Sequence, residues 1–261
     1  PTRAQSIAMT TSVTAVRWSP VDVLMAVVWS ENSRDESGGR EPDASVKTDP
    51  GELLRSVAVA VDGPLAALGV EDYLVNVRDE QVAGALIDVQ VTPRPVLAAV
   101  RARVPVASAT ACSGVIDALS GLGPVSAWSV TASEPLPVAA PADAQSGTCR
   151  CEGMANLAFL RRPDRIDRET WLRTWLEEHT QVAIDTQSTT GYTQHVVVRA
   201  LTDDAPVIDG IVEEIFPLDA ARDLSGKGDE RLHVATEVQR QHVAVVRTLH
   251  VLLTLEPCAA L

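Results

Sequence analysis

Trp171, Trp175 and His179 follow one another at four-residue spacing in a segment with the pattern of an amphipathic helix. Residues four apart lie on one helical face, so the spacing predicts an imidazole among apolar side chains. Asp167 suits the N-cap, and Ile166 with Trp171 has the spacing of a hydrophobic staple. An imidazole here could act as a general acid or base because its pKa lies near neutrality. The residue types alone favour a core histidine with one hydrogen bond instead.

The secondary-structure elements expected around this helix occur in the order of a common folding unit. Apolar runs and turn residues predict strand, helix, two strands, helix and strand, at 151–160, 167–183, 192–201, 207–216, 230–246 and 247–255. This βαββαβ order is the ferredoxin-like unit, an antiparallel sheet with both helices on one face.

The first half of the chain predicts the same order. A strand at 21–29 precedes a helix that begins near Pro50, is kinked or broken at Gly63-Pro64 and stops at Gly69. We then expect strands at 70–77 and 85–92, a helical region at 93–122 broken by Pro105, and a strand at 125–131. Proline-rich residues 133–147 read as a linker between units 1–132 and 148–261. The fold class is α+β, and two such sheets packed together would bury both exposed faces.

Three segments of the second half resemble the EthD domain family: Ala158-Phe-Leu-Arg-Arg-Pro163, Asp167-Arg-Glu-Thr-Trp-Leu-Arg-Thr-Trp-Leu-Glu-Glu-His179 and Asp209-Gly-Ile-Val-Glu-Glu-Ile-Phe216. The resemblance covers roughly residues 151–255, and its most specific piece is Trp175-x-x-x-His179. It implies a dimeric α/β barrel, here formed within one chain by tandem ferredoxin-like units with a degenerate first unit. It also implies a ligand cleft between sheet and helices. Relatives include monooxygenases, polyketide cyclases and muconolactone-type isomerases.

The resemblance also implies site residues. His179 matches the family's helix histidine, Trp175 the aromatic residue before it, and Glu213 the acidic residue of the third strand. Glu213 and Glu214 must face opposite sides of their strand, so at most one enters the cleft, and the resemblance alone selects Glu213. His195 departs from the family pattern and is either a local specialisation or an exposed strand residue. The expected catalytic residues are His179, Glu213 and His195, and the expected substrate-binding residues are Trp171, Trp175, Tyr192 and Gln194.

The composition limits the partners. A net charge of −13 disfavours nucleic acid and anionic membrane surfaces, and the apolar runs are shorter than the roughly 20 residues of a membrane span. We expect a cytoplasmic protein, a monomer with an internal pseudo-dimer or a homodimer. Four cysteines are too few for a disulfide framework. Cys149 and Cys151 lack further ligands nearby, so we expect neither a metal nor another cofactor.

Two functions remain open, beside the case in which Trp171, Trp175 and His179 only fill a core. The first is an enzyme that acts on a small apolar or aromatic molecule by cofactor-independent oxygenation, dehydration or cyclisation, with His179 as acid or base. The second is a non-catalytic carrier or accessory protein for a hydrophobic compound. The polar content of the pocket distinguishes them, because an enzyme needs a second polar group near His179.

Overall fold

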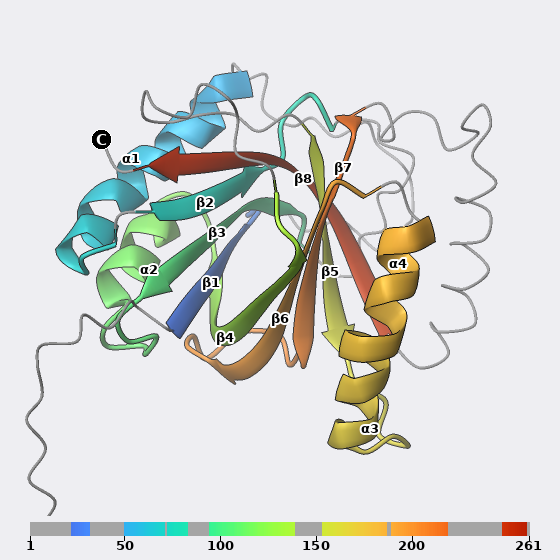
Figure 1. Cartoon of the computed structure of the whole chain (residues 1–261). Helices are drawn as coiled ribbons and strands as arrows, with labels where there is room; N and C mark the ends of the chain where they lie inside the picture. The colour runs from blue at the N-terminus through green and yellow to red at the C-terminus, as the bar shows by residue number, and fades with distance from the viewer. Residues whose placement is uncertain are drawn as a thin grey trace, which may run out of the picture.

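A computed structural model describes residues 22–31, 50–70, 72–82, 94–138, 153–186, 189–218 and 247–259 of the chain. These residues form, in chain order, β1 (Asp22–Trp29), α1 (Pro50–Ala67), β2 (Asp72–Val77), β3 (Val96–Val104), α2 (Ser113–Ser120), β4 (Val125–Leu136), β5 (Met154–Arg161), α3 (Arg168–Arg173), a π-helical segment (Thr174–His179), α4 (Thr180–Thr186), β6 (Gly191–Ala200), β7 (Gly210–Phe216) and β8 (Arg247–Ala259) (Figure 1).

The described strands close into an antiparallel barrel in the order β1-β3-β2-β8-β5-β7-β6-β4. This circle contains the ferredoxin-like order twice, as β4-β1-β3-β2 and as β8-β5-β7-β6. The two sets join through the β2–β8 and β4–β6 pairs. The strand order therefore confirms an α+β fold in which tandem ferredoxin-like units form an α/β barrel within one chain.

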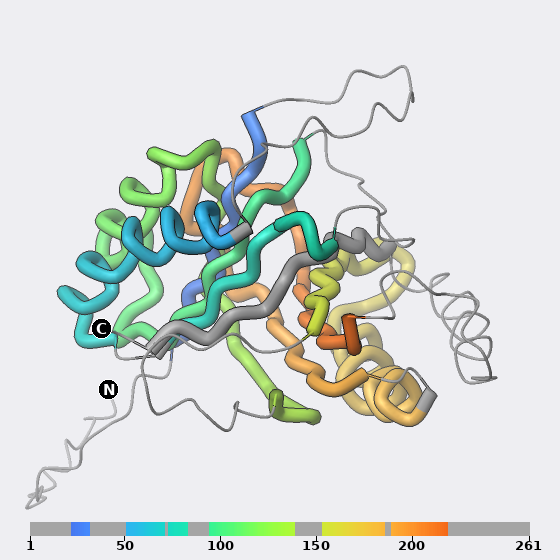
Figure 2. Tube along the Cα trace, turned by 90° about the horizontal axis from the view of Figure 1, so that it is seen from above, coloured from blue at the N-terminus to red at the C-terminus, as the bar shows by residue number. Residues whose placement is uncertain are grey.

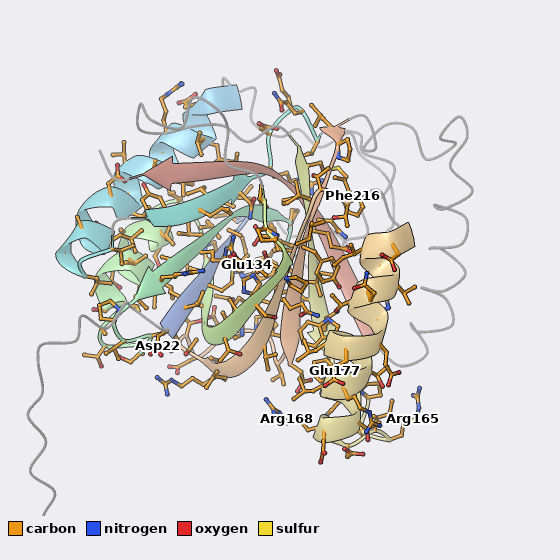
Figure 3. All side chains as sticks on the ribbon, in the orientation of Figure 1. Asp22, Glu134, Arg165, Arg168, Glu177 and Phe216 are labelled. Carbon is orange, nitrogen blue, oxygen red and sulfur yellow. The ribbon has the colours of Figure 1, made fainter. Side chains whose placement is uncertain are left out.

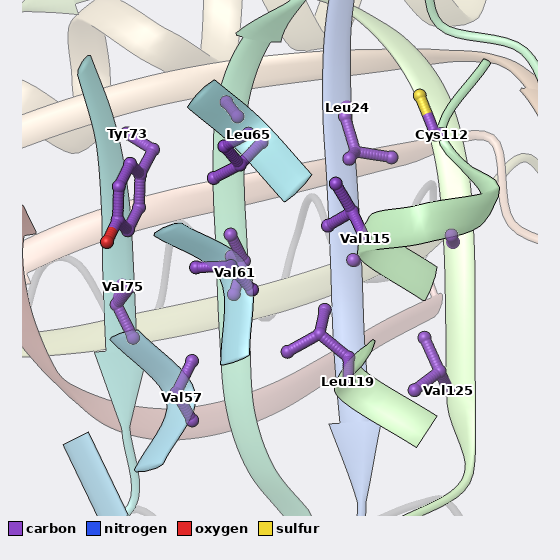
Figure 4. Packing of buried hydrophobic residues seen from close by; sticks show 14 of the residues in the cluster. Leu24, Val57, Val61, Leu65, Tyr73, Val75, Cys112, Val115, Leu119 and Val125 are labelled. Carbon is purple, nitrogen blue, oxygen red and sulfur yellow. The ribbon is translucent and has the colours of Figure 1, made fainter. Parts of the chain in front are cut away.

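Helices cover the barrel on two opposite sides (Figure 2). On one side, α1 and α2 bury Val61 and Val115 against Leu24 and other outward residues of β1, β3 and β2 (Figure 4). On the other side, α3, the π-helical segment and α4 lie over β5, β7 and β6. Strand side chains alternate between faces, so each strand sends one set toward a helix and the next set into the barrel.

The third strand of the first unit corrects the prediction for residues 93–122. Residues Val96–Val104 form β3, and only Ser113–Ser120 is helical. Strand β3 lies between β1 and β2. Its side chains alternate between faces, so Ala98 packs toward the helices while Ala99 packs inside the barrel. A strand apolar on both faces lacks the alternation that distinguishes it from a helix. The strand expected at 85–92 lies outside the described residues.

Of the two alternatives expected at Gly63-Pro64, a kink or a break, the break does not occur, because helix α1 continues to Ala67. Val57, Val61 and Leu65 are all buried in one stripe that runs past the proline. Packing of this stripe on the sheet offsets the lost backbone hydrogen bond. Gly69, with φ of +73°, follows the helix end as expected.

The second unit follows its prediction closely in the described residues. Strands β5, β6, β7 and β8 fall within a few residues of the expected ranges. The helix expected at 230–246 lies outside the described residues. Strand β4 extends to Leu136, which pairs with Tyr192, so the first residues of the expected linker belong to the barrel. The division into units 1–132 and 148–261 stays a prediction.

Candidate functional site

An aromatic layer lies between the second unit's helix and the outer face of its sheet. Asp167 caps α3 as predicted, because its carboxylate accepts a hydrogen bond from the Thr170 N–H. The helix buries Trp171 and Trp175, whose ring centroids lie 4.9 Å apart at an interplanar angle of 42°. Tyr192 of β6 belongs to the same buried cluster.

Gly210, the first residue of β7, allows Trp175 to approach the sheet. A Cβ atom at this position would lie 2.4 Å from Cη2 of Trp175, much closer than any real contact. The indole ring therefore lies directly against the strand backbone. Gly210 thus leaves space for the indole ring of Trp175. Its neighbour Asp209 accepts a hydrogen bond of 2.7 Å from the Arg162 N–H.

The π-helical segment changes which residue faces the sheet after Trp175. The wider turn makes Thr180 the next fully buried position, whereas His179 is only half-buried. The Thr180 hydroxyl donates to the Trp175 carbonyl at 2.9 Å and accepts a hydrogen bond from Gln194 Nε2. The expectation that the four-residue spacing buries His179 is thus corrected, since the π turn adds one residue to the step.

Glu214 is the buried carboxyl group on this face of the sheet. It is paired in register with Asn156 on β5 and with Tyr192 on β6. Asn156 Nδ2 donates a hydrogen bond of 3.0 Å to its Oε2. Burial raises the pKa of Glu214 to about 7, and the Asn156 hydrogen bond only partly opposes this. Burial, together with the nearby Glu214, also raises the pKa of Tyr192.

Glu213 points to the other face, into the barrel. Asn76 Nδ2 donates to Glu213 Oε1 at 2.8 Å, and Oε2 lies 3.4 Å from Arg101 Nε and 3.5 Å from His195 Nε2. Burial acts to raise the pKa of Glu213, but Arg101, His195 and Asn76 outweigh it and lower the pKa to about 2. Burial lowers the pKa of His195, against the opposing effect of Glu213.

The predicted site residues thus divide between two faces of one sheet. Trp171, Trp175, Tyr192 and Gln194 lie together under the helix, and His179 lies at the helix edge. Glu213 and His195 lie together inside the barrel, and His195 is fully buried rather than exposed. The catalytic and substrate-binding roles given to these residues stay predictions.

Sequence reasoning missed Glu214, Asn156 and Thr180. A signal existed for Asn156, which interrupts the apolar run of β5, Met154–Arg161. Strand alternation placed Glu213 and Glu214 on opposite faces, but the choice of Glu213 for the cleft under the helix is wrong, because Glu214 faces the helix and Glu213 lies inside the barrel. Arg101 was missed because its strand was expected to be a helix.

The described residues were also compared with the requirements of a membrane-spanning helix and of a metal site. In the described part of the chain, no helix has the length and apolar character needed to cross a membrane. The same residues contain no cluster of three or more His, Cys, Asp or Glu side chains that could hold a metal ion. Cys149 and Cys151 lie outside the described residues.

The fold and the site define a single-chain α/β barrel with an aromatic layer and a buried carboxyl group under one helix. No family model and no curated protein match the chain. Similar solved structures include a "putative monooxygenase" from Lactobacillus acidophilus NCFM, with 11% identity, a TM-score of 0.44 and coverage of 93% of this chain and 97% of that chain. A "putative monooxygenase" from Fusobacterium nucleatum subsp. nucleatum has 8% identity, a TM-score of 0.45 and coverage of 94% and 98%.

An anthrone oxidase-like protein is similar at 12% identity and a TM-score of 0.45, with coverage of 92% of this chain and 93% of that chain. The fold assignment rests on the strand order of this chain itself. Membership of the EthD family stays a prediction.

Proposed function

We propose that this protein binds a small, flat, largely apolar or aromatic molecule between the α3–α4 helix and the β5-β7-β6 sheet, and that Glu214 exchanges a proton with it. The observation that carries the proposal is the position of Glu214, a buried carboxyl group held by Asn156 beside the aromatic layer. The reaction would be cofactor-independent oxygenation, dehydration or cyclisation.

The aromatic layer supports a flat ligand. Trp171, Trp175 and Tyr192 are buried beside one another, and aromatic side chains favour offset or edge contacts with further rings. The indole Nε1 atom of Trp171 is buried without a hydrogen-bond acceptor among the described residues. It would offer an N–H donor to a carbonyl or hydroxyl oxygen of a ligand, as binding sites with few polar groups commonly do.

The environment of Glu214 suits proton transfer near neutral pH. A carboxyl group with a pKa of about 7 is populated in both protonation states at that pH, so it can accept a proton in one step and return it in another. His179, at the edge of the helix that covers Glu214, is a second candidate for this proton exchange.

All three reactions can share one first step. The base removes a proton from an activated C–H or O–H group, which leaves an enolate or phenolate on the bound molecule. The anion then reacts with dioxygen, eliminates water or attacks an internal carbonyl.

We also propose that the chain is a divergent EthD-like protein. The Trp175-x-x-x-His179 spacing and the ferredoxin-like strand order support this proposal.

The common step can be tested with β-tetralone, a flat ketone with acidic C–H groups, by following deuterium incorporation from D₂O by NMR. We expect the wild type to accelerate exchange and Glu214→Gln to lower that acceleration about 100-fold or more. His179→Gln measures the share of the histidine, and Glu177→Gln, exposed on the same helix, is the matched control.

Quenching of Trp fluorescence by β-tetralone separates binding from chemistry. Binding without any exchange would contradict the enzymatic proposal and favour the carrier. Equal exchange in the wild type and in Glu214→Gln would contradict the role of Glu214.

A further inference from the structure

The barrel interior contains a polar cluster that the proposed reaction does not use. Asn76 of β2 and Arg101 of β3 come from the first unit, and His195 of β6 and Glu213 of β7 come from the second. Contacts of 2.8 to 3.5 Å join all four side chains through the Glu213 carboxylate. We call these four residues the interior polar cluster. It lies across the sheet from Glu214.

Two polar atoms of this cluster are buried without a hydrogen-bond partner among the described residues. They are Asn76 Oδ1 and His195 Nδ1. His195 is fully buried, and Asn76 and Glu213 are 1% and 2% exposed. Native proteins pair nearly all such atoms, and where protein groups do not suffice a bound polar molecule does so. Two unpaired atoms in one buried cluster therefore indicate an occupant.

We propose that the interior polar cluster is a binding site for a small neutral molecule that carries a hydroxyl group, either water or a short alcohol. The two share the donor and acceptor capacity of one O–H group, and experiment can distinguish them.

The charges of the cluster favour a neutral occupant. The Arg101 guanidinium already balances the Glu213 carboxylate. Burial favours the uncharged form of His195, whose pKa is lowered. A bound ion would therefore add an uncompensated charge to a buried site, which is strongly unfavourable.

The pattern of donors and acceptors favours a hydroxyl group. Asn76 Oδ1 only accepts hydrogen bonds, and a neutral imidazole donates from one nitrogen and accepts at the other. His195 Nε2 faces the Glu213 carboxylate at 3.5 Å, which assigns the proton to Nε2 and leaves Nδ1 as an acceptor. An occupant must therefore donate a hydrogen bond, and O–H is the smallest neutral group that both donates and accepts.

A series of charged side chains connects this site to the surface. Arg101 Nη1 lies 3.0 Å from Glu134 Oε1, and Arg103 Nη2 lies 3.8 Å from the same oxygen. Side-chain exposure rises from 15% at Arg101 to 34% at Glu134 and 69% at Arg103. Glu134 is labelled in Figure 3. This series of charged side chains therefore leads from the buried cluster to solvent.

Crystals of the full chain, grown without alcohols or glycols and then soaked in methanol, test the site. We expect electron density within hydrogen-bond distance of His195 Nδ1 and Asn76 Oδ1. Density of one oxygen atom that does not change on soaking identifies water, and density that extends by one carbon identifies an exchangeable alcohol. An empty space, or a protein side chain that already contacts these atoms, would overturn the proposal.

Solution NMR of the ¹⁵N-histidine-labelled wild type gives an independent result that needs no variant. Two-bond ¹H–¹⁵N spectra should show His195 as the neutral Nε2–H tautomer, with Nδ1 shifted as the acceptor of a hydrogen bond. A wild-type His195 in the imidazolium form, or with an Nδ1 shift typical of a free lone pair, would also overturn the proposal.

Discussion

Glu213 and Glu214 are adjacent in β7, yet their carboxyl groups lie on opposite faces of the sheet and their pKa values shift in opposite directions. Glu213 is held ionised inside the barrel by Arg101, His195 and Asn76, with a pKa of about 2. Glu214 is buried under the helix, where it accepts a hydrogen bond from Asn156, and burial raises its pKa to about 7. Neighbouring positions in one strand thus provide one permanent anion and one group that titrates near neutrality.

Glu214→Gln should change how stability depends on pH. The folded-state pKa of Glu214 is raised above its ordinary value, so the folded protein holds this proton more tightly than the unfolded chain. In the wild type this group therefore lowers stability by about 1.4 kcal/mol per unit as pH rises from about 4.5 to 7. Urea unfolding at several pH values should show that Glu214→Gln lacks this loss. Parallel pH dependences of the two proteins would contradict the assignment.

Glu213→Gln should change the pH dependence of stability in the opposite direction. The folded-state pKa of Glu213 is lowered, so its contribution to stability is present above the ordinary pKa of about 4.5 and is lost as pH falls toward 2. At pH 7 the substitution leaves Arg101 without the Glu213 charge and should cost about 3 kcal/mol. Urea unfolding at pH 7 measures this loss. A loss under about 0.5 kcal/mol, typical of a solvated surface carboxylate, would be the contrary result.

Gly210→Ala should disrupt the contact with Trp175. Its Cβ would lie 2.4 Å from the indole ring, and such overpacking typically costs about 1–3 kcal/mol in the free energy of unfolding. Gly63→Ala is the matched control, because nothing lies within 4 Å of its Cβ and the residue is inside α1. That control should stabilise the protein by about 1 kcal/mol through helix propensity. Equal effects of the two substitutions would show that Trp175 does not contact Gly210.

Thr180→Val should test the hydrogen bonds of the π-helical segment. The valine keeps the shape of threonine but cannot bond the Trp175 carbonyl or accept from Gln194, which leaves buried polar groups unpaired at a cost of about 1–3 kcal/mol. Thr174→Val, at a half-buried position of the same segment, is the control and should change stability by less. Thermal unfolding of both variants measures the difference. A Thr180→Val protein as stable as the control would mean that the hydroxyl does not hold this turn.

Much of the second unit follows from local patterns in the sequence. The Asp167 cap and the apolar stripe with Trp171 and Trp175 predict the helix, and alternation predicts the strands around Tyr192 and Gln194. These signals are local, because capping and one-sided burial depend on residues a few positions apart.

The remaining features depend on contacts between distant residues. The π turn buries Thr180 in place of His179, and Gln194 of β6 donates a hydrogen bond to the Thr180 hydroxyl. The face of each carboxyl group follows from the register that pairs Glu214 with Asn156. The first residues of strand β3 are buried on both faces, toward the helices and inside the barrel, and this position cannot be recognised from the strand's own residues.

The central claim is that Glu214 exchanges a proton with a bound flat molecule, and the pH dependence of β-tetralone exchange tests it most directly. The wild-type rate should rise with pH and level off above an inflection near pH 7, as the carboxyl group loses its proton and becomes a base. Glu214→Gln should lose both the inflection and most of the rate. An identical pH profile in the variant, or a wild-type profile without an inflection near 7, would contradict the claim.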